Sequence, residues 1–347
     1  MKIAICGLSF CGKSAVFKAI VGKETQARTS ASGKIHLNIG TLELKDQRLG
    51  KLAEILNLEK VTYPKISLVD LARAGEKASK GIETAQLKEF DALVLVIGVF
   101  VSGDPLEDLK NIESEFILAD LQVAQSRIEK INKERKARPK GEEDPEALLL
   151  KRCQAALEEG KLIKELKLTP EELKMLAGFQ FLTLKPLIII ADVSEEQLNK
   201  GENGGLEQAA KGKSLPFLAL CAKLETEIEE LPEEERSDFM KEMGLNALSK
   251  DKFIQICFQA QNFISFFTVV GKQARAWPIV KGKTALEAAG SVHSDMARGF
   301  IRAEVINYQD FIQSGSFAKA KEKGLLRLES KEYLVQDGDI INFKFNV

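Results

Sequence analysis

The sequence predicts an α/β fold built on a parallel sheet, and three observations support this prediction. Short, continuous apolar runs alternate with helical-looking stretches through most of the chain, as expected for parallel strands that are buried on both faces. A glycine-rich turn follows the first run, and residues 263–347 change to a strand-rich composition. The runs expected to form the sheet are Ile3–Cys6, Ile66–Val69, Leu93–Ile97, Leu187–Ile190 and Phe217–Leu220.

The first run leads into the pattern G-x-x-x-x-G-K-S, which spans Gly7–Ser14. In this motif the glycines turn backbone N–H groups toward phosphate, the lysine approaches the β- and γ-phosphates, and the serine hydroxyl ligates Mg²⁺. A buried strand before the motif and an amphipathic helix after it distinguish a phosphate-binding loop, or P-loop, from a plain glycine turn. The predicted phosphate-binding residues are Leu8, Ser9, Phe10, Cys11, Gly12, Lys13, Ser14 and Ala15.

The next strands supply a carboxylate. Residues 34–44 alternate between apolar and polar side chains, which predicts a half-exposed edge strand. The buried run after it ends at Asp70, where nucleotide-binding switch proteins carry a carboxylate near Mg²⁺. An aspartate at a strand end can equally cap a helix. The sequence therefore predicts Ser14 and Asp70 as the metal site, with capping as the other role open to Asp70.

Two later loops are expected to read the base of a bound nucleotide. Asp192–Glu195 follows the fourth run and Cys221–Lys223 follows the fifth, and loops after neighbouring parallel strands can converge on one ligand. An ionised Asp192 accepts hydrogen bonds but donates none, so it can accept from the adenine amino group and cannot donate to N7. The predicted base-binding residues are Asp192, Val193, Glu195, Cys221, Ala222 and Lys223.

Two segments differ in composition from the rest. Residues 107–183 are dense in Glu, Lys, Leu and Ala, with apolar residues at three- and four-residue steps and a break at Arg138–Pro145, which predicts an inserted helical hairpin. A helix over Lys250–Asn262 precedes the strand-rich end of the chain. The expected domains are a nucleotide-binding domain of residues 1–106 and 184–262, the hairpin of residues 107–183, and a third domain of residues 263–347.

Composition excludes several classes of protein. The 347 residues carry a net charge of −1, so no global basic field favours nucleic acid. Five cysteines without a C-x-x-C pair and only two histidines argue against structural zinc or a disulfide framework. Without an apolar run long enough to span a bilayer, the chain is expected to be soluble and cytoplasmic. Cys11, near Lys13 and a helix N-terminus, is either a thiol of lowered pKa or simply a small loop residue.

Several stretches also match one known family. They are Ile264–Val269, Arg275–Trp277, Ala288–Gly290, His293–Asp295, Gly299–Val305 and Val335–Asp339, with Arg48–Ile55, Lys77–Gly81 and Ala119–Leu121 in the amino-terminal half. On these residues the chain resembles the Obg-like ATPases of the YchF family along essentially its whole length. The resemblance implies a ubiquitin-like (TGS, β-grasp) third domain, Mg²⁺ as cofactor, ATP rather than GTP as ligand, and association with ribosomes or structured RNA as a monomer.

The chain departs from the family at positions that matter for hydrolysis. The glycine of the family's Asp-x-x-Gly motif is Arg73, the switch threonine is Lys34, and the asparagine of the base-reading motif is Asp192. Ala74 stands near the place of a water-orienting glutamine in related switch enzymes, where the family itself has an apolar residue. We therefore expect slow or absent hydrolysis, with no assigned catalytic residue except Arg73, which could serve as a built-in arginine finger.

Two functions remain open at this point. The first is a divergent ATPase that hydrolyses ATP slowly and couples its nucleotide state to ribosome association; the second is a nucleotide-binding scaffold without turnover. A P-loop metabolic kinase is disfavoured because the hairpin and the third domain have no obvious role in one. In the third domain, His293 and Asp295 are expected to stabilise a turn. Lys281, Lys283, Arg298 and Arg302 are either a modest basic face for RNA phosphates or simply the solvated cations of a charged domain.

Overall fold

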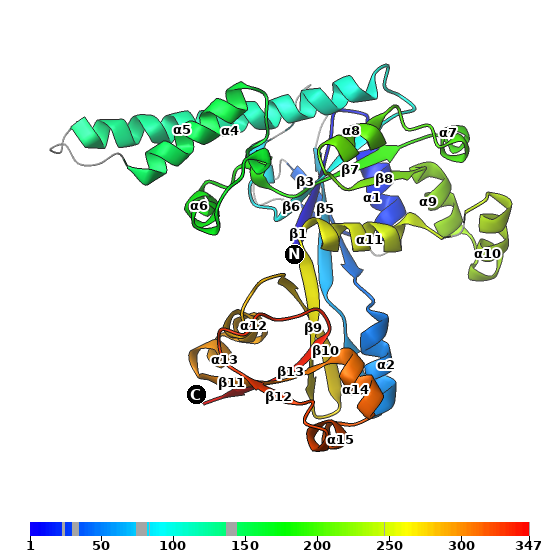
Figure 1. The fold of residues 1–347 in the computed structure, drawn as a ribbon. Helices are drawn as coiled ribbons and strands as arrows, with labels where there is room; N and C mark the ends of the chain where they lie inside the picture. The colour runs from blue at the N-terminus through cyan, green and yellow to red at the C-terminus, as the bar shows by residue number, and fades with distance from the viewer. Residues whose placement is uncertain are drawn as a thin grey trace. The chain divides into compact units, whose positions relative to one another are not determined.

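The computed structural model describes residues 1–22, 25–29, 35–73, 82, 84–136, 144–245 and 247–346 (Figure 1). The chain divides into two compact units. Unit 1 comprises Met1–Thr41 and Ser67–Phe253, and unit 2 comprises Leu42–Ile66 and Ile254–Val347. In the described ranges, no helix has both the length and the apolar composition needed to cross a membrane.

Unit 1 is built on a seven-stranded sheet of order β2-β3-β5-β1-β6-β7-β8 among the described residues. The strands are β1 (Lys2–Cys6), β2 (Thr25–Thr29), β3 (Ile35–Glu43), β5 (Lys65–Arg73), β6 (Ala92–Gly98), β7 (Leu187–Asp192) and β8 (Phe217–Leu220). Strands β5, β1, β6, β7 and β8 pair in parallel, which confirms the predicted fold class. Strand β2 pairs antiparallel with β3, so β3 is not the edge strand that its alternation predicted.

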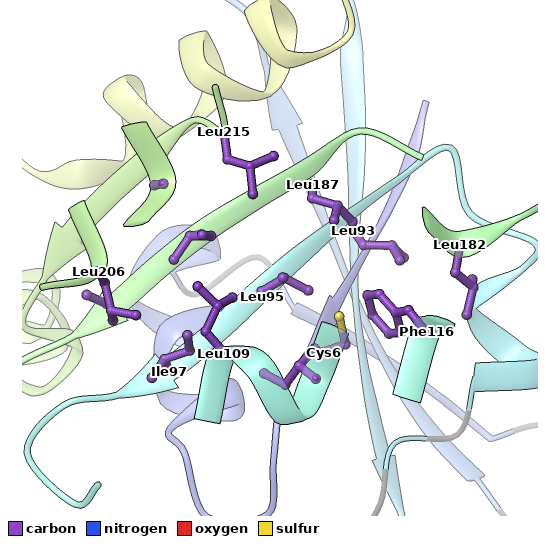
Figure 2. Close-up of a cluster of buried hydrophobic side chains, with 14 of the residues drawn as sticks. Cys6, Leu93, Leu95, Ile97, Leu109, Phe116, Leu182, Leu187, Leu206 and Leu215 are labelled. Carbon is purple, nitrogen blue, oxygen red and sulfur yellow. The ribbon is translucent and has the colours of Figure 1, made fainter. Parts of the chain in front are cut away.

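One face of this sheet is covered by helices through a continuous apolar core (Figure 2). Leu93, Leu95 and Ile97 alternate along β6 and pack in the same cluster as Leu109 and Phe116, which belong to the long helix α4 (Pro105–Lys136). Because β6 is buried on both faces, its sequence reads as an unbroken apolar run. Further helices of unit 1 are α1 (Lys13–Val21), α3 (Thr84–Leu87), α7 (Glu195–Lys200), α8 (Leu206–Gly212), α9 (Ala222–Glu230) and α10 (Glu233–Glu242), the last of which packs on α9.

The expected helical insertion is present and belongs to unit 1. Helix α4 packs along α5 (Pro145–Glu158) through a second apolar cluster that includes Ile128, Leu150 and Cys153. Buried Asp120 of α4 accepts hydrogen bonds from the backbone N–H groups of Leu182 and Thr183, at 3.0 and 2.7 Å, and ties the end of the insertion to α4. After α5, the insertion continues through η1 (Ile163–Glu165), α6 (Pro170–Leu176), η2 (Ala177–Phe179) and η3 (Leu182–Leu184).

Unit 2 contains, in the part of the chain that the structure describes, a six-stranded mixed sheet of order β12-β11-β13-β9-β10-β4. Its strands are β4 (Lys60–Thr62), β9 (Phe263–Val270), β10 (Gln273–Val280), β11 (Phe300–Asn307), β12 (Arg327–Glu329) and β13 (Asp339–Phe345). One face packs on α12 (Ala285–Val292), next to α13 (Ser294–Arg298), and the other on α2 (Gln47–Leu56), α14 (Tyr308–Ser314) and α15 (Phe317–Glu322). Helix α11 (Ser249–Ala260) leads into β9.

Residues 42–66 do not belong to the domain in which the sequence analysis placed them. They were expected in the nucleotide-binding domain, but they form part of unit 2. Leu49 and Leu52 of α2 are fully buried in one cluster with Phe267 and Ala274, so the apolar stripe of α2 completes the core of the C-terminal sheet. The segment is therefore an excursion of the chain into unit 2. Strand β3, before it, begins in unit 1, and strand β5, after it, ends in unit 1.

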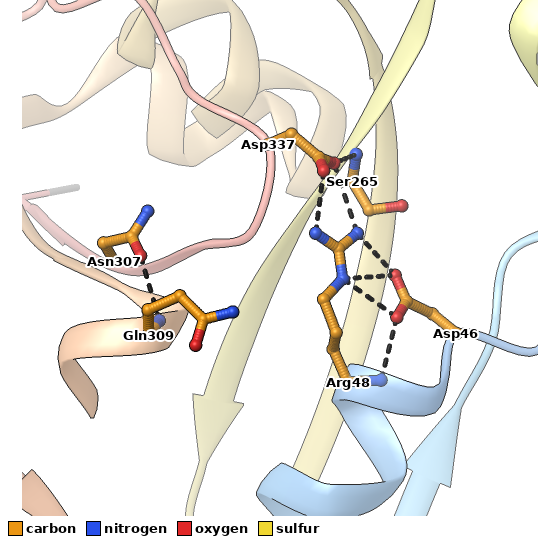
Figure 3. A network of polar contacts seen from close by, with 6 residues as sticks. All are labelled: Asp46, Arg48, Ser265, Asn307, Gln309 and Asp337. Atoms are coloured by element: carbon orange, nitrogen blue, oxygen red, sulfur yellow. Dashed lines mark hydrogen bonds and ion pairs between the residues drawn. The ribbon is translucent and has the colours of Figure 1, made fainter. Parts of the chain in front are cut away.

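A polar network fixes the start of α2 within unit 2 (Figure 3). The guanidinium of Arg48 donates from Nε to Asp46, at 3.0 Å, and from Nη1 to Asp337, at 2.7 Å. Asp337 in turn accepts from the backbone N–H of Ser265, at 2.9 Å. Since 289 residues separate Arg48 from Asp337, this pairing joins the excursion to the C-terminal turn.

Candidate nucleotide-binding site

The G-x-x-x-x-G-K-S segment forms the turn between β1 and α1. Gly12 has φ of 93°, and a Cβ at this position would clash with the carboxylate of Asp192. A Cβ on Gly7 would clash with the carbonyl oxygen of Val96. Gly12 also caps α1 without a side-chain hydrogen bond, so the first N–H groups of the helix remain available to an anion.

Lys13 closes over the phosphate loop. Its Nζ donates to the carbonyl oxygens of Gly7 and Leu8, at 3.1 and 2.5 Å. An ammonium held above the loop by two carbonyls is placed to exchange those acceptors for phosphate oxygens. Phe10, at the tip of the loop, has a positive φ of 65° and leaves 89% of its surface exposed. Its aromatic ring therefore contributes nothing to the core.

The surroundings of Cys11 contradict one of its two predicted roles, that of a thiol with a lowered pKa. The thiol is buried beneath the loop, and this burial raises its pKa, although the Lys13 ammonium nearby acts in the opposite direction. Desolvation disfavours the thiolate and here exceeds the attraction of one ammonium. Cys11 is thus a small packing residue at pH 7 and not an activated thiol.

Ser14 and Asp70 come together at the start of α1. The Oγ of Ser14 donates to Oδ2 of Asp70 at 2.8 Å, and Nδ2 of Asn38 donates to the same oxygen at 3.3 Å. Asp70 is almost fully buried and lies within β5, which continues to Arg73 and does not end at Asp70 as expected. Asn38, on β3, was not predicted, because one amide in an alternating strand carries no motif.

The donor set at Ser14 and Asp70 fits Mg²⁺. A hydroxyl and a carboxylate are hard oxygen ligands, and Mg²⁺ is usually held by one or two such groups together with phosphate oxygens and water. Within the described part of the chain, no group of three or more His, Cys, Asp or Glu residues is arranged to hold a metal without a substrate. The ion would neutralise charge on the phosphates, and the two residues would fix its position beside the loop.

Asp192 is buried beneath the phosphate loop. It is the last residue of β7, is 3% exposed, and accepts a hydrogen bond from the backbone N–H of Ala222 at 3.0 Å. Burial raises the pKa of Asp192 to about 6, with a smaller contribution from Glu225 and an opposing one from the Ala222 bond. The loops after β7 and β8 therefore meet at this carboxyl group, which also lies close to Gly12 of the phosphate loop.

The remaining base-loop residues divide by exposure. Val193, Cys221 and Ala222 are buried. Glu195 begins α7 as an exposed residue, and the Lys223 side chain is mostly exposed at the start of α9. The structure thus brings Asp192 and Ala222 into contact and leaves Glu195 and Lys223 open to solvent.

Residues missed by the sequence analysis follow β6. The position of a Cβ on Gly98 lies 2.9 Å from both the carbonyl oxygen of Cys11 and Cγ2 of Val101, so this loop contacts the phosphate loop. Phe100 and Val101 are both at least half exposed. Phe100 and Val101 follow a strand at the same edge of the sheet as Asp192. This position in the sequence could have identified them as candidate site residues.

The structure describes one of the three positions linked to hydrolysis. Arg73 is described only as the last residue of β5, and nothing is described of its side chain. Lys34 and Ala74 lie outside the described residues.

A parallel sheet with G-x-x-x-x-G-K-S between its first strand and first helix defines the class of P-loop nucleoside-triphosphatase folds. Residues 263–346 match the family YchF-GTPase_C, described as a protein of unknown function (DUF933). The chain is 36% identical to the "Ribosome-binding ATPase YchF" of Bacillus subtilis (strain 168), covering 99% of this chain and 98% of the relative. It is also 36% identical to the protein of that name from Escherichia coli O157:H7, covering 100% and 99%. The chain therefore belongs to the YchF family.

Solved structures share the fold. The Schizosaccharomyces pombe YchF GTPase superposes with a TM-score of 0.80 at 22% identity, covering 99% of this chain and 97% of the other. A GTP-binding protein from Pyrococcus horikoshii OT3 gives a TM-score of 0.63 at 15% identity, covering 100% of both chains. At these identities the two structures support the architecture alone, including the inserted helices and the C-terminal sheet.

Proposed function

We propose that this protein binds a purine nucleoside triphosphate with Mg²⁺ at the Gly7–Ser14 loop and uses the bound nucleotide to control association with the ribosome. The observation that carries the proposal is the 2.8 Å contact between Ser14 and buried Asp70 beside an uncapped helix N-terminus. The backbone N–H groups of the loop and the Lys13 ammonium would hold the phosphates. Ser14 and Asp70 would position the metal, which supplies charge neutralisation when bound.

The proposed nucleotide is ATP, with GTP as the alternative. Asp192 offers no amide donor, and one of its oxygens already accepts from Ala222. The other oxygen lies against Gly12 and would have to become accessible to accept from the adenine amino group, so the preference for ATP should be smaller than in a relative that carries asparagine. The hydrogen bond that an asparagine donates and Asp192 cannot is worth about 1 kcal/mol, so the preference for ATP should be roughly fivefold weaker than in such a relative.

Ribosome association is proposed from the relatives. The curated YchF proteins carry the name "Ribosome-binding ATPase", and they match this chain over its whole length. A soluble, cytoplasmic monomer acting on ribosomes or structured RNA is consistent with this name. The second candidate function is a nucleotide-binding scaffold without turnover. It is favoured by Arg73 and Lys34, which replace the glycine and threonine that position phosphate and metal in the family.

Titration calorimetry with ATP, GTP and their diphosphates, with and without Mg²⁺, tests the proposed site. We expect ATP to bind more tightly than GTP, and Mg²⁺ to strengthen triphosphate binding in the parent but not in Ser14→Ala. In the presence of EDTA the parent and Ser14→Ala should bind alike, which controls for damage to the loop. A clear preference for GTP would reject the adenine assignment, and absence of triphosphate binding would reject the function.

Single-turnover hydrolysis distinguishes the two candidate functions. We expect turnover by the parent to be very slow, because phosphoryl transfer depends on positioning the metal, the γ-phosphate and the attacking water. Arg73→Gly restores the family's residue and should raise the rate, whereas Arg73→Ala, which removes the side chain without the freedom of glycine, should not. Brisk turnover by the parent that collapses in both variants would instead make Arg73 a catalytic arginine.

A further inference from the structure

One part of the sheet in unit 2 has an uncovered face. Ala274 and Ala276 of β10 lie in the cluster formed with α2, so the alternate residues Gln273, Arg275 and Trp277 point to the opposite side. Gln273 and Arg275 are exposed there, and Trp277 is half-buried.

The neighbouring strands extend this face. Thr268 of β9 lies opposite Arg275, and Thr62 of β4 is paired with Arg275 on the other side. Directly paired residues share a face of the sheet. We call this surface the β10 face and define it by Lys60, Thr62, Thr268, Gln273, Arg275 and Trp277.

The charge of the β10 face is of one sign. It carries two cations, Lys60 and Arg275, and no carboxylate. Among the residues that the structure describes, neither cation forms an ion pair. Glu59, next to Lys60, is paired with Lys272 at the turn between β9 and β10. An anion approaching the face would therefore meet two cations without a competing carboxylate.

Arg275 is preorganised on this face. Its Cζ lies 3.8 Å from the centroid of the Trp277 ring. Nε1 of Trp277 donates to Oγ1 of Thr268 at 2.9 Å, and Phe266 stacks on the indole with ring centroids 6.5 Å apart. The indole is thus fixed by two contacts and holds the guanidinium by a cation–π interaction, so little rotamer entropy remains to be lost on binding.

We propose that the β10 face binds a single-stranded RNA segment, with Arg275 as its central contact. The guanidinium presents N–H donors to a phosphate and an open side on which a base can stack, while the threonines and Gln273 offer hydrogen bonds to base edges and 2′-hydroxyls. This inference deepens the proposed ribosome association and rests on it in taking RNA as the partner. An acidic peptide would use the two charges but neither the stacking surface nor the row of hydroxyls.

Three of the four cations expected to form a basic face fit this role less well, whereas Lys281 is exposed. Lys283 is paired with Glu287 at 2.6 Å, and Arg298 with Asp295. His293 accepts a hydrogen bond at Nδ1 from the backbone N–H of Asp295 and caps α13, as a turn-stabilising residue would. Arg302 lies on β11 beside Ala303, whose side chain packs on the α12 side, so Arg302 points away from the β10 face.

Fluorescence anisotropy with the full chain and a labelled oligoadenylate tests the proposal. We expect Arg275→Ala to weaken binding about tenfold and to reduce the slope of log affinity against log salt concentration by about 0.7. Arg275→Lys should retain the slope but lose most of the affinity, because a lysine does not stack. Arg302→Ala removes the same charge from the other face and should bind as the parent does. Trp277 is the single tryptophan of the chain, so its fluorescence should change when the oligomer binds.

Several outcomes would overturn the proposal: no binding by the parent, unchanged binding by Arg275→Ala and Arg275→Lys, or an equal loss in Arg302→Ala. Competition by oligoglutamate as effective as that by unlabelled oligoadenylate at equal charge would assign the face to an acidic protein instead. ATP titration of the same variants keeps the two hypotheses separate. If the parent binds neither ATP nor ribosomes, yet binds oligoadenylate through Arg275, the proposed function fails and this inference stands.

Discussion

Replacing Lys13 by alanine is expected to lower ATP affinity by at least about 100-fold, since each charge-assisted hydrogen bond to phosphate contributes about 1.5–3 kcal/mol. The side chain contacts only loop carbonyl oxygens and Cys11 in the described structure, so its removal leaves the core intact. Titration calorimetry measures the loss, and circular dichroism verifies the fold.

The matched control for this variant is Lys18→Ala. Lys18 is an exposed residue of the same helix, five positions away from Lys13, and its removal subtracts the same charge. Lys18→Ala should bind ATP with nearly parental affinity. If Lys13→Ala binds as tightly as Lys18→Ala, the loop does not hold phosphate and the proposed function fails at its first step.

Asp192→Asn is expected to raise the free energy of unfolding by up to about 3 kcal/mol at pH 8. The folded pKa of about 6 exceeds the ordinary value of 3.8, so the folded state holds a proton that the unfolded chain releases. Stability is therefore lost as the pH rises from about 4 to about 6, and the full cost, at about 1.4 kcal/mol per pH unit, persists above that range. An asparagine oxygen can still accept from Ala222 but carries no charge.

Urea denaturation of both proteins between about pH 4 and pH 8 measures this difference. The gain should be largest at the alkaline end and small near pH 4, where the aspartate is protonated in the folded state and partly protonated in the unfolded chain. Glu225, whose pKa is also raised by burial, repels the Asp192 carboxylate, so loss of this repulsion is part of the gain expected in the variant. A variant no more stable than the parent at pH 8 would show that the carboxylate is stabilised in the fold. The added amide donor should also sharpen the preference for ATP.

The sequence was most informative where a strand is buried on both faces. Leu93, Leu95 and Ile97 stand in an unbroken apolar run, and β6 forms close to the limits that this run predicts. Strand β2 has the mostly polar sequence Thr-Gln-Ala-Arg-Thr, and β4 has only three residues, so neither has a period to detect. Their pairing is decided by tertiary contacts and not by local preference.

The same contrast holds at the site. The G-x-x-x-x-G-K-S motif predicts local backbone geometry, and Ser14 follows from it directly. The pKa values of Cys11 and Asp192 depend on how deeply each group is buried by segments distant in sequence. Charges near Cys11 in the sequence favour a lowered pKa, but desolvation, which no local pattern reveals, is the larger effect.

The excursion at residues 42–66 also sets an order of events during synthesis. Leu49 and Leu52 find their partners on strands that begin at Phe263, so roughly 200 residues must be made after the excursion before its core can close. At about 5–20 residues per second, the apolar stripe of α2 waits on the order of 10–40 s on the ribosome. A fragment that starts at Phe263 would lack α2, so Phe267 and Ala274 would be left without the helix that covers them.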